Sequence, residues 1–126
     1  MKTMDVYKCG HCDEIFEKLF EGSACEEEGC ACEDMEMLDA QTADWKNEKH
    51  VPVVEKVEGG IRVYVGSTLH PMTDEHWITL IEVKKGDMVM RKHLHPGDKP
   101  EAVFPIDDTD VVAREYCNIH GLWANQ

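Results

Sequence analysis

Five side chains with metal-binding chemistry lie in three separate stretches of the 126-residue chain: His50, His70 with His76, and Cys117 with His120. Zinc usually takes four ligands in a closed tetrahedron, whereas four imidazole nitrogens with one thiolate sulfur favour an open, redox-active metal of higher coordination number. A single histidine is more often exposed to solvent or hydrogen-bonded in a core. The five residues together favour a metal site.

Short strands are the elements that would position these ligands. Runs of β-forming residues bounded by turn signals predict strands at residues 51–54, 61–65, 77–83, 88–91, 101–104 and 111–116. No segment has the periodicity of an amphipathic helix, so the pattern predicts an all-β fold, an immunoglobulin-like antiparallel β-sandwich. Each candidate ligand flanks one of these strands, where side chains can converge without disturbing a core.

The cysteines indicate a second, smaller unit. Five of the six cysteines lie in the first 32 residues: Cys9, Cys12, Cys25, Cys30 and Cys32. Such a short segment cannot build a sufficient core, so we expect metal or disulfides to hold it together. The sequence therefore predicts a cysteine-rich domain at residues 1–36 and a β-sandwich domain at residues 37–126, with residues 37–48 as the linker.

Charge and hydropathy restrict the partners and the compartment. No apolar run approaches the roughly 20 residues that span a bilayer, and the charged start lacks the apolar stretch of a secretory signal. We expect a cytoplasmic protein without a membrane partner, and in that reducing compartment clustered cysteines favour metal over disulfides. The net charge of −13 argues against nucleic acid and anionic membranes. A small anionic substrate would need local positive charge, which Lys46 and Lys49 beside His50 can supply.

Three motifs resemble the iron-site motifs of superoxide reductases. They are residues 48–52 (Glu-Lys-His-Val-Pro), residues 70–78 (His-Pro-Met-Thr-Asp-Glu-His-Trp-Ile) and residues 117–123 (Cys-Asn-Ile-His-Gly-Leu-Trp). The cysteine-rich start makes the two-domain form, desulfoferrodoxin, the nearest resemblance. The resemblance covers nearly the whole chain, and three such motifs in this order are highly specific.

The resemblance implies a mononuclear non-haem iron. His50, His70, His76 and His120 would be its equatorial ligands, and the Cys117 thiolate its axial ligand. The thiolate would push electron density onto the iron and help it to give up one electron. Superoxide would bind the open axial position, take that electron and leave as hydrogen peroxide after protonation.

The same resemblance gives roles to the residues beside the ligands. Lys49 would attract superoxide and hold a water for proton delivery, and Glu48 would occupy the sixth position once the iron is ferric. A lysine is a mobile positive donor, and a carboxylate is a hard ligand suited to Fe(III). Elsewhere, an adjacent Glu and Lys would be a solvated surface pair. We also expect the backbone N–H of Ile119 to donate to the Cys117 sulfur.

Relatives with the extra domain hold a second iron on a Cys-x-x-Cys pair and an adjacent Cys-Cys pair. Cys9 and Cys12 match the first pair, but residues 30–32 read Cys-Ala-Cys, which departs from the second. The first-choice ligands are Cys9, Cys12, Cys30 and Cys32. Cys25 in place of one of the last two is the alternative. The site could hold iron or zinc, or be empty with partly oxidised thiols, because thiolate ligands discriminate weakly between these metals.

The sequence therefore predicts an enzyme, a superoxide reductase that an external donor such as rubredoxin re-reduces, and the resemblance implies a homodimer. One alternative is a non-catalytic electron carrier or metal-binding module that relies on the amino-terminal thiolates. Another is thiol catalysis by Cys117 with His120 as its base. We do not expect His11, His93 or His95 to be ligands.

Overall fold

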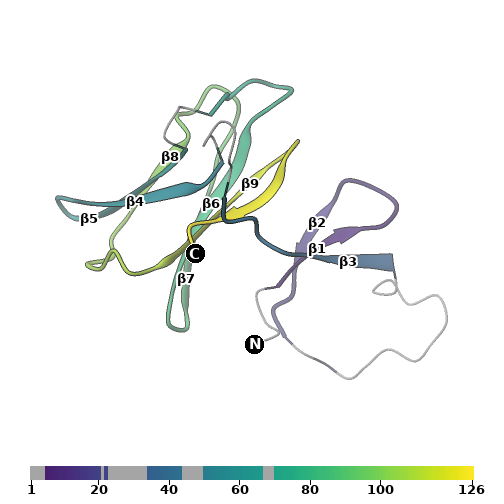
Figure 1. Cartoon of the computed structure of the whole chain (residues 1–126), viewed down its shortest axis with the longest axis horizontal. Helices are drawn as coiled ribbons and strands as arrows, with labels where there is room; N and C mark the ends of the chain where they lie inside the picture. The colour runs from purple at the N-terminus through teal and green to yellow at the C-terminus, as the bar shows by residue number, and fades with distance from the viewer. Residues whose placement is uncertain (1–4, 21, 23–33, 44–49, 67–69) are drawn as a thin grey trace. The chain divides into compact units, whose positions relative to one another are not determined.

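The computed structural model describes residues 5–20, 22, 34–43, 50–66 and 70–126, and the chain divides into two compact units, Met1–Asp39 and Ala40–Gln126. The described residues form ten β-strands in antiparallel sheets and no α-helix (Figure 1). This confirms the predicted all-β fold. Among these residues, none belongs to a helix long and apolar enough to cross a membrane.

The first unit is a small three-stranded sheet. Its strands are β1 (Val6–Cys9), β2 (Ile15–Glu17) and β3 (Met35–Leu38), and β1 lies between the other two, antiparallel to both. Gly10 follows β1 directly. A Cβ atom on Gly10 would lie 2.5 Å from the carbonyl oxygen of Asp34, so only glycine allows the chain to turn here.

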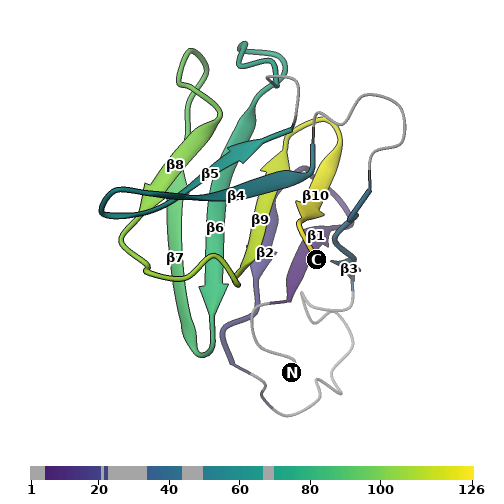
Figure 2. The ribbon, with the colours of Figure 1, turned by 60° about the vertical axis from the view of Figure 1, so that its left-hand side comes forward.

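The second unit consists of two antiparallel sheets that enclose one core (Figure 2). One sheet has the strand order β10-β9-β6-β7, and the other β4-β5-β8. The bounds are β4 (Pro52–Val57), β5 (Gly60–Val65), β6 (Ile78–Lys85), β7 (Met88–His93), β8 (Glu101–Phe104), β9 (Val112–Cys117) and β10 (Gly121–Ala124). Constant-type immunoglobulin domains also have four strands facing three. The arrangement agrees with the immunoglobulin-like β-sandwich that the sequence predicted.

Alternation of side chains along the strands produces this core. Ile61, Val63 and Val65 of β5 are fully buried, and they pack in one cluster with Ala113 and Cys117 of β9. The residues that alternate with the buried ones, such as Arg62 and Tyr64 of β5 and Tyr116 of β9, are only partly buried, because successive side chains of a strand point to opposite faces. Cys117 is therefore a core residue as well as a candidate ligand.

A β-bulge at the start of β6 adjusts the register beside the candidate site. β6 pairs with β9 through Ile78 opposite Cys117, and the register shifts before Leu80 pairs with Tyr116. Because of this extra residue, Ile78 and Ile81 both point into the core, although three positions separate them. The bulge thus keeps β6 buried while Ile78 stays aligned with Cys117.

The predicted linker is partly wrong. Met37 and Leu38 belong to β3, where they pair with β1, so the first unit continues to Asp39 and not only to residue 36. Gln41 forms a parallel bridge with Trp123 of β10. Residues 44–48, the rest of the predicted linker, lie outside the described part of the chain.

The prediction also missed that Cys117 and His120 are followed by another strand. Gly121 pairs with Cys117, and Ala124 with Arg114, so β10 covers the free side of β9. The four residues of β10 carry no alternating pattern that could have predicted them. They form a strand because β9 offers unpaired backbone groups next to a tight turn.

An ionic network joins β9, which ends at Cys117, to β6, which begins two residues after His76. Glu82 of β6 is buried, and its carboxylate pairs with Arg91 of β7 and Arg114 of β9, the residues directly opposite it on each side. The Arg91 guanidinium approaches to 2.6 Å. Such a buried carboxylate is tolerated only while both cations compensate it.

We predict that Glu82→Ala lowers the free energy of unfolding by about 3 kcal/mol or more, because it leaves two guanidinium groups without their shared carboxylate. Chemical denaturation of the full chain measures this. Asp107→Ala is the control, since it breaks an exposed ion pair with Lys56. The Asp107 side chain is 92% exposed and the Lys56 side chain is 73% exposed. If the two variants lose equal stability, the buried network is not what joins these strands.

Candidate metal centre

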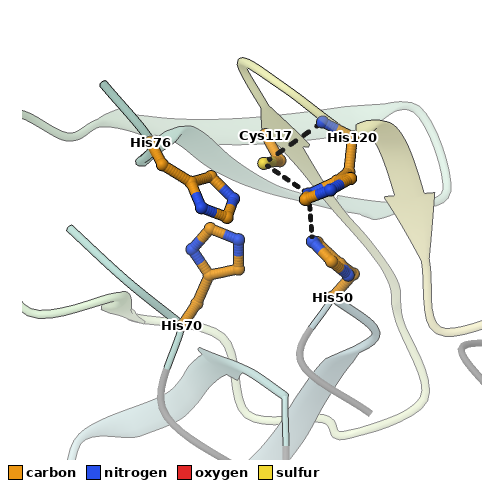
Figure 3. A group of neighbouring side chains, drawn as sticks. All are labelled: His50, His70, His76, Cys117 and His120. Carbon is orange, nitrogen blue, oxygen red and sulfur yellow. Dashed lines mark hydrogen bonds between the residues drawn. The ribbon is translucent and has the colours of Figure 1, made fainter. Parts of the chain in front are cut away.

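Five candidate ligands approach one point from four places in the second unit (Figure 3). His50 lies two residues before β4, and His70 and His76 lie in the connection from β5 to β6. Cys117 is the last residue of β9, and His120 lies in the turn that leads into β10. Because β9 pairs with both β6 and β10, His76, Cys117 and His120 come together.

The ligand atoms of all five residues lie within 4.8 Å of one another. His50 Nε2 is 3.0 Å from His120 Nδ1, and the Cys117 sulfur is 3.7 Å from the same nitrogen. Few buried clusters bring four imidazoles and a thiol so close, and a cation between them would satisfy all five ligand atoms at once. These distances therefore fit a metal site.

The four imidazole rings lie near the corners of a square. Going round the site, the ring centroids are 4.9 Å apart for His50–His70, 4.5 Å for His70–His76, 5.0 Å for His76–His120 and 4.6 Å for His120–His50. The diagonal from His50 to His76 is 6.5 Å. This is close to the ratio of diagonal to side in a square, so the rings can supply four nitrogens around the middle of one metal ion.

The Cys117 side chain is the most deeply buried of the five that offer ligand atoms. Cys117 is fully buried in the core cluster, whereas His120 is exposed. Burial raises the pKa of the Cys117 thiol, while backbone N–H groups of His120 and Ile119 lower it again. The His120 N–H lies 3.4 Å from the sulfur. The predicted contribution of the Ile119 backbone is thus present, together with a second donor that the sequence did not suggest.

The protonation of His70 is determined by its neighbour in the chain. His70 Nδ1 is 2.7 Å from the Pro71 carbonyl oxygen, which can only accept, so Nδ1 carries the proton. His70 Nε2 is then an acceptor, and it is buried without a hydrogen-bond partner. Metal-binding histidines commonly donate their other ring N–H to a carbonyl in this way. An unsatisfied buried nitrogen beside three other imidazoles fits a cation as its missing partner.

Trp123 connects two of the ligands. Its ring stacks on His50 with centroids 4.7 Å apart and an angle of 16°, and its Nε1 donates to the His120 carbonyl oxygen at 3.1 Å. Gln41 Nε2 donates to the same oxygen at 3.2 Å. Gly121, the next residue, has φ +88°, a left-handed conformation that glycine adopts without strain. The turn that carries His120 is therefore held from several directions.

A compact turn holds His76. Thr73 and His76 exchange backbone hydrogen bonds of 2.9 and 3.2 Å, and the Thr73 hydroxyl contacts the backbone of His76 as well. Asn118 joins this turn to the β9–β10 turn through its side chain. The sequence did not identify Gln41 or Asn118 as site residues. Asn118 at least had a visible signal, since it lies between two ligands in the third motif.

The remaining predicted residues of this site lie outside the described part of the chain. They are Lys46, Glu48 and Lys49. Of the other histidines, His93 ends β7 and is exposed, and His95 Nδ1 lies 3.6 Å from Asp98 Oδ2. Trp77 lies beside His76, where its backbone N–H and carbonyl both bond to Asn118.

Only part of the predicted amino-terminal site is described. Cys9 and Cys12 are free thiols around the Gly10 turn, and the His11 N–H is 3.4 Å from the Cys9 sulfur. This hydrogen bond is the main reason that the pKa of Cys9 is lowered. The His11 ring pairs with Asp34 at 3.0 Å. Cys25, Cys30 and Cys32 lie outside the described residues.

The donor set fits a redox-active transition metal such as iron. Imidazole nitrogens suit iron, and a thiolate is a strong electron donor to it. His50, His70, His76 and His120 would hold the ion through ring nitrogens, and Cys117 through its sulfur. Bound there, the metal would supply one-electron redox chemistry.

The metal-free protein should lose stability as the pH falls. Burial and the neighbouring histidines lower the pKa of His70 from 6.5 to about 4. Between these values the unfolded chain binds a proton that the folded chain does not, so the free energy of unfolding decreases as the pH falls from about 6.5 to about 4. The full effect is at most about 3 kcal/mol. Chemical denaturation of the metal-free protein across this range measures it.

His70→Asn should flatten this pH dependence, whereas His95→Asn, at a side chain that is 80% exposed, should leave it unchanged. An equal slope in the wild type and in His70→Asn would show that His70 is not the group responsible.

Comparisons with known proteins agree with this site. A sequence profile of the family described as Desulfoferrodoxin matches residues 42–126. The desulfoferrodoxin of Syntrophotalea carbinolica is 46% identical over 125 residues, which cover 99% of this chain and 98% of that protein. A superoxide reductase of Pyrococcus horikoshii is 37% identical over 105 residues, covering 68% of this chain and 91% of that one.

The fold has a solved counterpart along its entire length. The crystal structure of the superoxide reductase from Treponema pallidum matches with a TM-score of 0.73 and 29% sequence identity, and the match covers 100% of both chains. The family profile spans the whole β-sandwich with all five converging ligands, and a relative aligns across almost the complete sequence. The chain therefore belongs to the desulfoferrodoxin family.

Proposed function

We propose that this protein is a superoxide reductase, an oxidoreductase that reduces superoxide to hydrogen peroxide at a non-haem iron held by four histidines and one cysteine. The observation that carries the proposal is the near-square of four imidazole rings together with the buried Cys117 sulfur, with all five ligand atoms within 4.8 Å of one another. The names of two relatives support it. The one that is 46% identical is called a desulfoferrodoxin, and the one that is 37% identical is called a superoxide reductase.

The reaction takes one electron and two protons for each superoxide. When bound, ferrous iron would supply the electron and become ferric. The protein's part begins with Cys117, whose sulfur is surrounded by core residues and by the N–H groups of His120 and Ile119. These donors stabilise a thiolate in a place where burial alone would favour the neutral thiol. The four histidines and Cys117 would hold the iron, and superoxide would be the species that takes its electron.

The residues just before His50 would handle charge and protons. The chain has a net charge of −13, which repels an anion, so the site needs a local cation. Lys49 is adjacent to His50 in the sequence, and its ammonium group can attract superoxide and hold a water that delivers protons. Glu48 would offer ferric iron a hard carboxylate oxygen. The position of Lys49 and Glu48 one and two residues before the ligand His50 supports both roles.

We propose a second metal in the first unit, iron or zinc, on Cys9, Cys12, Cys30 and Cys32, with Cys25 as the alternative to one of the last two. Support comes from Cys9 and Cys12, which flank the tight turn at Gly10, and from the lowered pKa of Cys9. A thiol that loses its proton readily is a better metal ligand.

The electron donor, the assembly and the compartment remain predictions from the sequence. A rubredoxin-like protein would re-reduce the centre after each turnover, and the protein would act as a homodimer in the cytoplasm. The motifs that resemble superoxide reductases are the support for the donor and the dimer. The chain's cysteine usage and hydropathy are the support for the compartment.

The metal content and the absorption spectrum of the oxidised protein test the centre. We expect iron, with a thiolate-to-ferric charge-transfer band that Cys117→Ser abolishes, because the sulfur is its source. Cys12→Ser is the control: it should keep this band and change only absorption from the amino-terminal thiolates. A wild-type protein that contains only zinc and shows no such band would falsify the proposed iron centre.

The role of Lys49 can be measured on the rate of reaction with superoxide. Lys49→Ala should lower the second-order rate constant about tenfold or more and weaken its dependence on ionic strength, because a local cation steers the anion. Lys49→Arg should retain most of the rate. Lys56→Ala, at a surface lysine paired with Asp107, is the matched control and should have no effect. Pulse radiolysis gives these rates, and an unchanged rate in Lys49→Ala contradicts the assignment.

A further inference from the structure

The side chain of Asn118 joins the two turns that carry His76 and Cys117. Its Oδ1 accepts from the backbone N–H of Trp77 at 2.9 Å, and its Nδ2 donates to the backbone carbonyl of Glu75 at 2.9 Å. These two peptide groups lie on either side of His76. Asn118 itself follows Cys117 directly, so one amide connects the immediate neighbours of two ligands.

The Asn118 amide continues the pairing between β6 and β9, whose backbone ladder ends before it reaches His76. The ladder between β6 and β9 ends at Ile78 opposite Cys117. One further main-chain contact follows, from the Asn118 N–H to the Trp77 carbonyl at 3.3 Å. His76 lies beyond it. An asparagine side chain offers one acceptor and two donors, like a peptide group, and can therefore continue the pairing by one more step.

We propose that Asn118 is a positioning residue for the metal centre, whose side-chain amide holds the backbone on both sides of His76 in place relative to Cys117. The inference rests on the proposed function, because it assigns a role at the same site. The hydrogen bonds of Asn118 go to backbone groups of Glu75 and Trp77 and not to a ligand side chain. Asn118 acts through His76, whose ring nitrogen must meet a metal that the Cys117 sulfur also binds.

Exposure of Asn118 strengthens this interpretation. An exposed asparagine adds little to a hydrophobic core, and water could satisfy its amide equally well. Both of its polar atoms nevertheless bond to the backbone of the histidine turn at short distances. What the bonds provide is the relative placement of two ligand turns.

Asn125 provides a matched control in the same strand pair. Its Oδ1 accepts from the Ala113 N–H at 2.9 Å, and its Nδ2 donates to the Val111 carbonyl at 3.0 Å. The side chain thus makes the same two kinds of bond, to backbone groups on either side of one residue, at the other end of β9. None of the five ligands lies within that stretch.

The experiment compares Asn118→Ala and Asn125→Ala in the full-length protein, with Co²⁺ as the metal probe. Affinity is measured by competition with a chelator, and the Co²⁺ absorption bands report the geometry of the site. We expect Asn118→Ala to weaken Co²⁺ binding about 10- to 100-fold, as changes to residues that orient metal ligands do, and to shift the bands. Asn125→Ala should keep the wild-type affinity and spectrum.

The stabilities of the metal-free variants separate positioning from folding. Both substitutions remove two hydrogen bonds, so both should lower stability, and only Asn118→Ala should also reduce the extra stabilisation that the metal gives. Asn118→Asp serves if the alanine variant does not fold. It retains the acceptor for Trp77 but turns an oxygen towards the Glu75 carbonyl, so the same spectral shift is expected.

Wild-type affinity and bands in Asn118→Ala, or an equal loss in Asn125→Ala, would overturn the inference. The outcome is independent of turnover: if Asn118 controls Co²⁺ binding while the wild type does not react with superoxide, the proposed function fails and the positioning role stands. If the wild type binds no Co²⁺ at the five ligands, both fail together.

Discussion

The antiparallel pairing of β6 with β9 is the constraint on which the metal centre depends. It aligns Ile78 with Cys117, and both side chains are fully buried in the same core cluster. A shift of one residue would turn the sulfur to the opposite face of the sheet and expose core residues, so burial determines the register. With that register, His76 and His120 leave their strands at the same end of the sheet.

Burial also determines the chemical state of the ligands. Without a cation, the buried surroundings favour a neutral His70 and a protonated Cys117. A neutral imidazole is already the form that binds metal, whereas the thiol must lose its proton as the metal enters. The N–H groups directed at the sulfur prepare it for that change. His70 is therefore ready to bind a metal, whereas Cys117 becomes a thiolate on binding.

Much of the site could be predicted from the sequence, because each ligand belongs to a short local motif. His70 and His76 lie in one connection between strands, and Cys117 and His120 lie close together around the turn between β9 and β10. The spacing within each pair is therefore local in the sequence. The β-strands that flank them have period-two patterns that indicate buried and exposed faces. Two residues, Gln41 and Asn118, escaped prediction for a physical reason. Their side chains bond to backbone atoms that only the fold brings near, and such a contact leaves no trace in residue type.

The sequence by itself determined which atoms can bind the metal and that they flank strands of an all-β fold. It also determined the net negative charge that makes a local cation necessary for an anionic substrate. Only the tertiary structure decided the order of the four imidazoles around the site, the burial of Cys117 in the core and the existence of β10. These properties depend on pairing between segments far apart in the chain. Such pairing is fixed by the joint burial of both partners, and a single segment contains only half of that information.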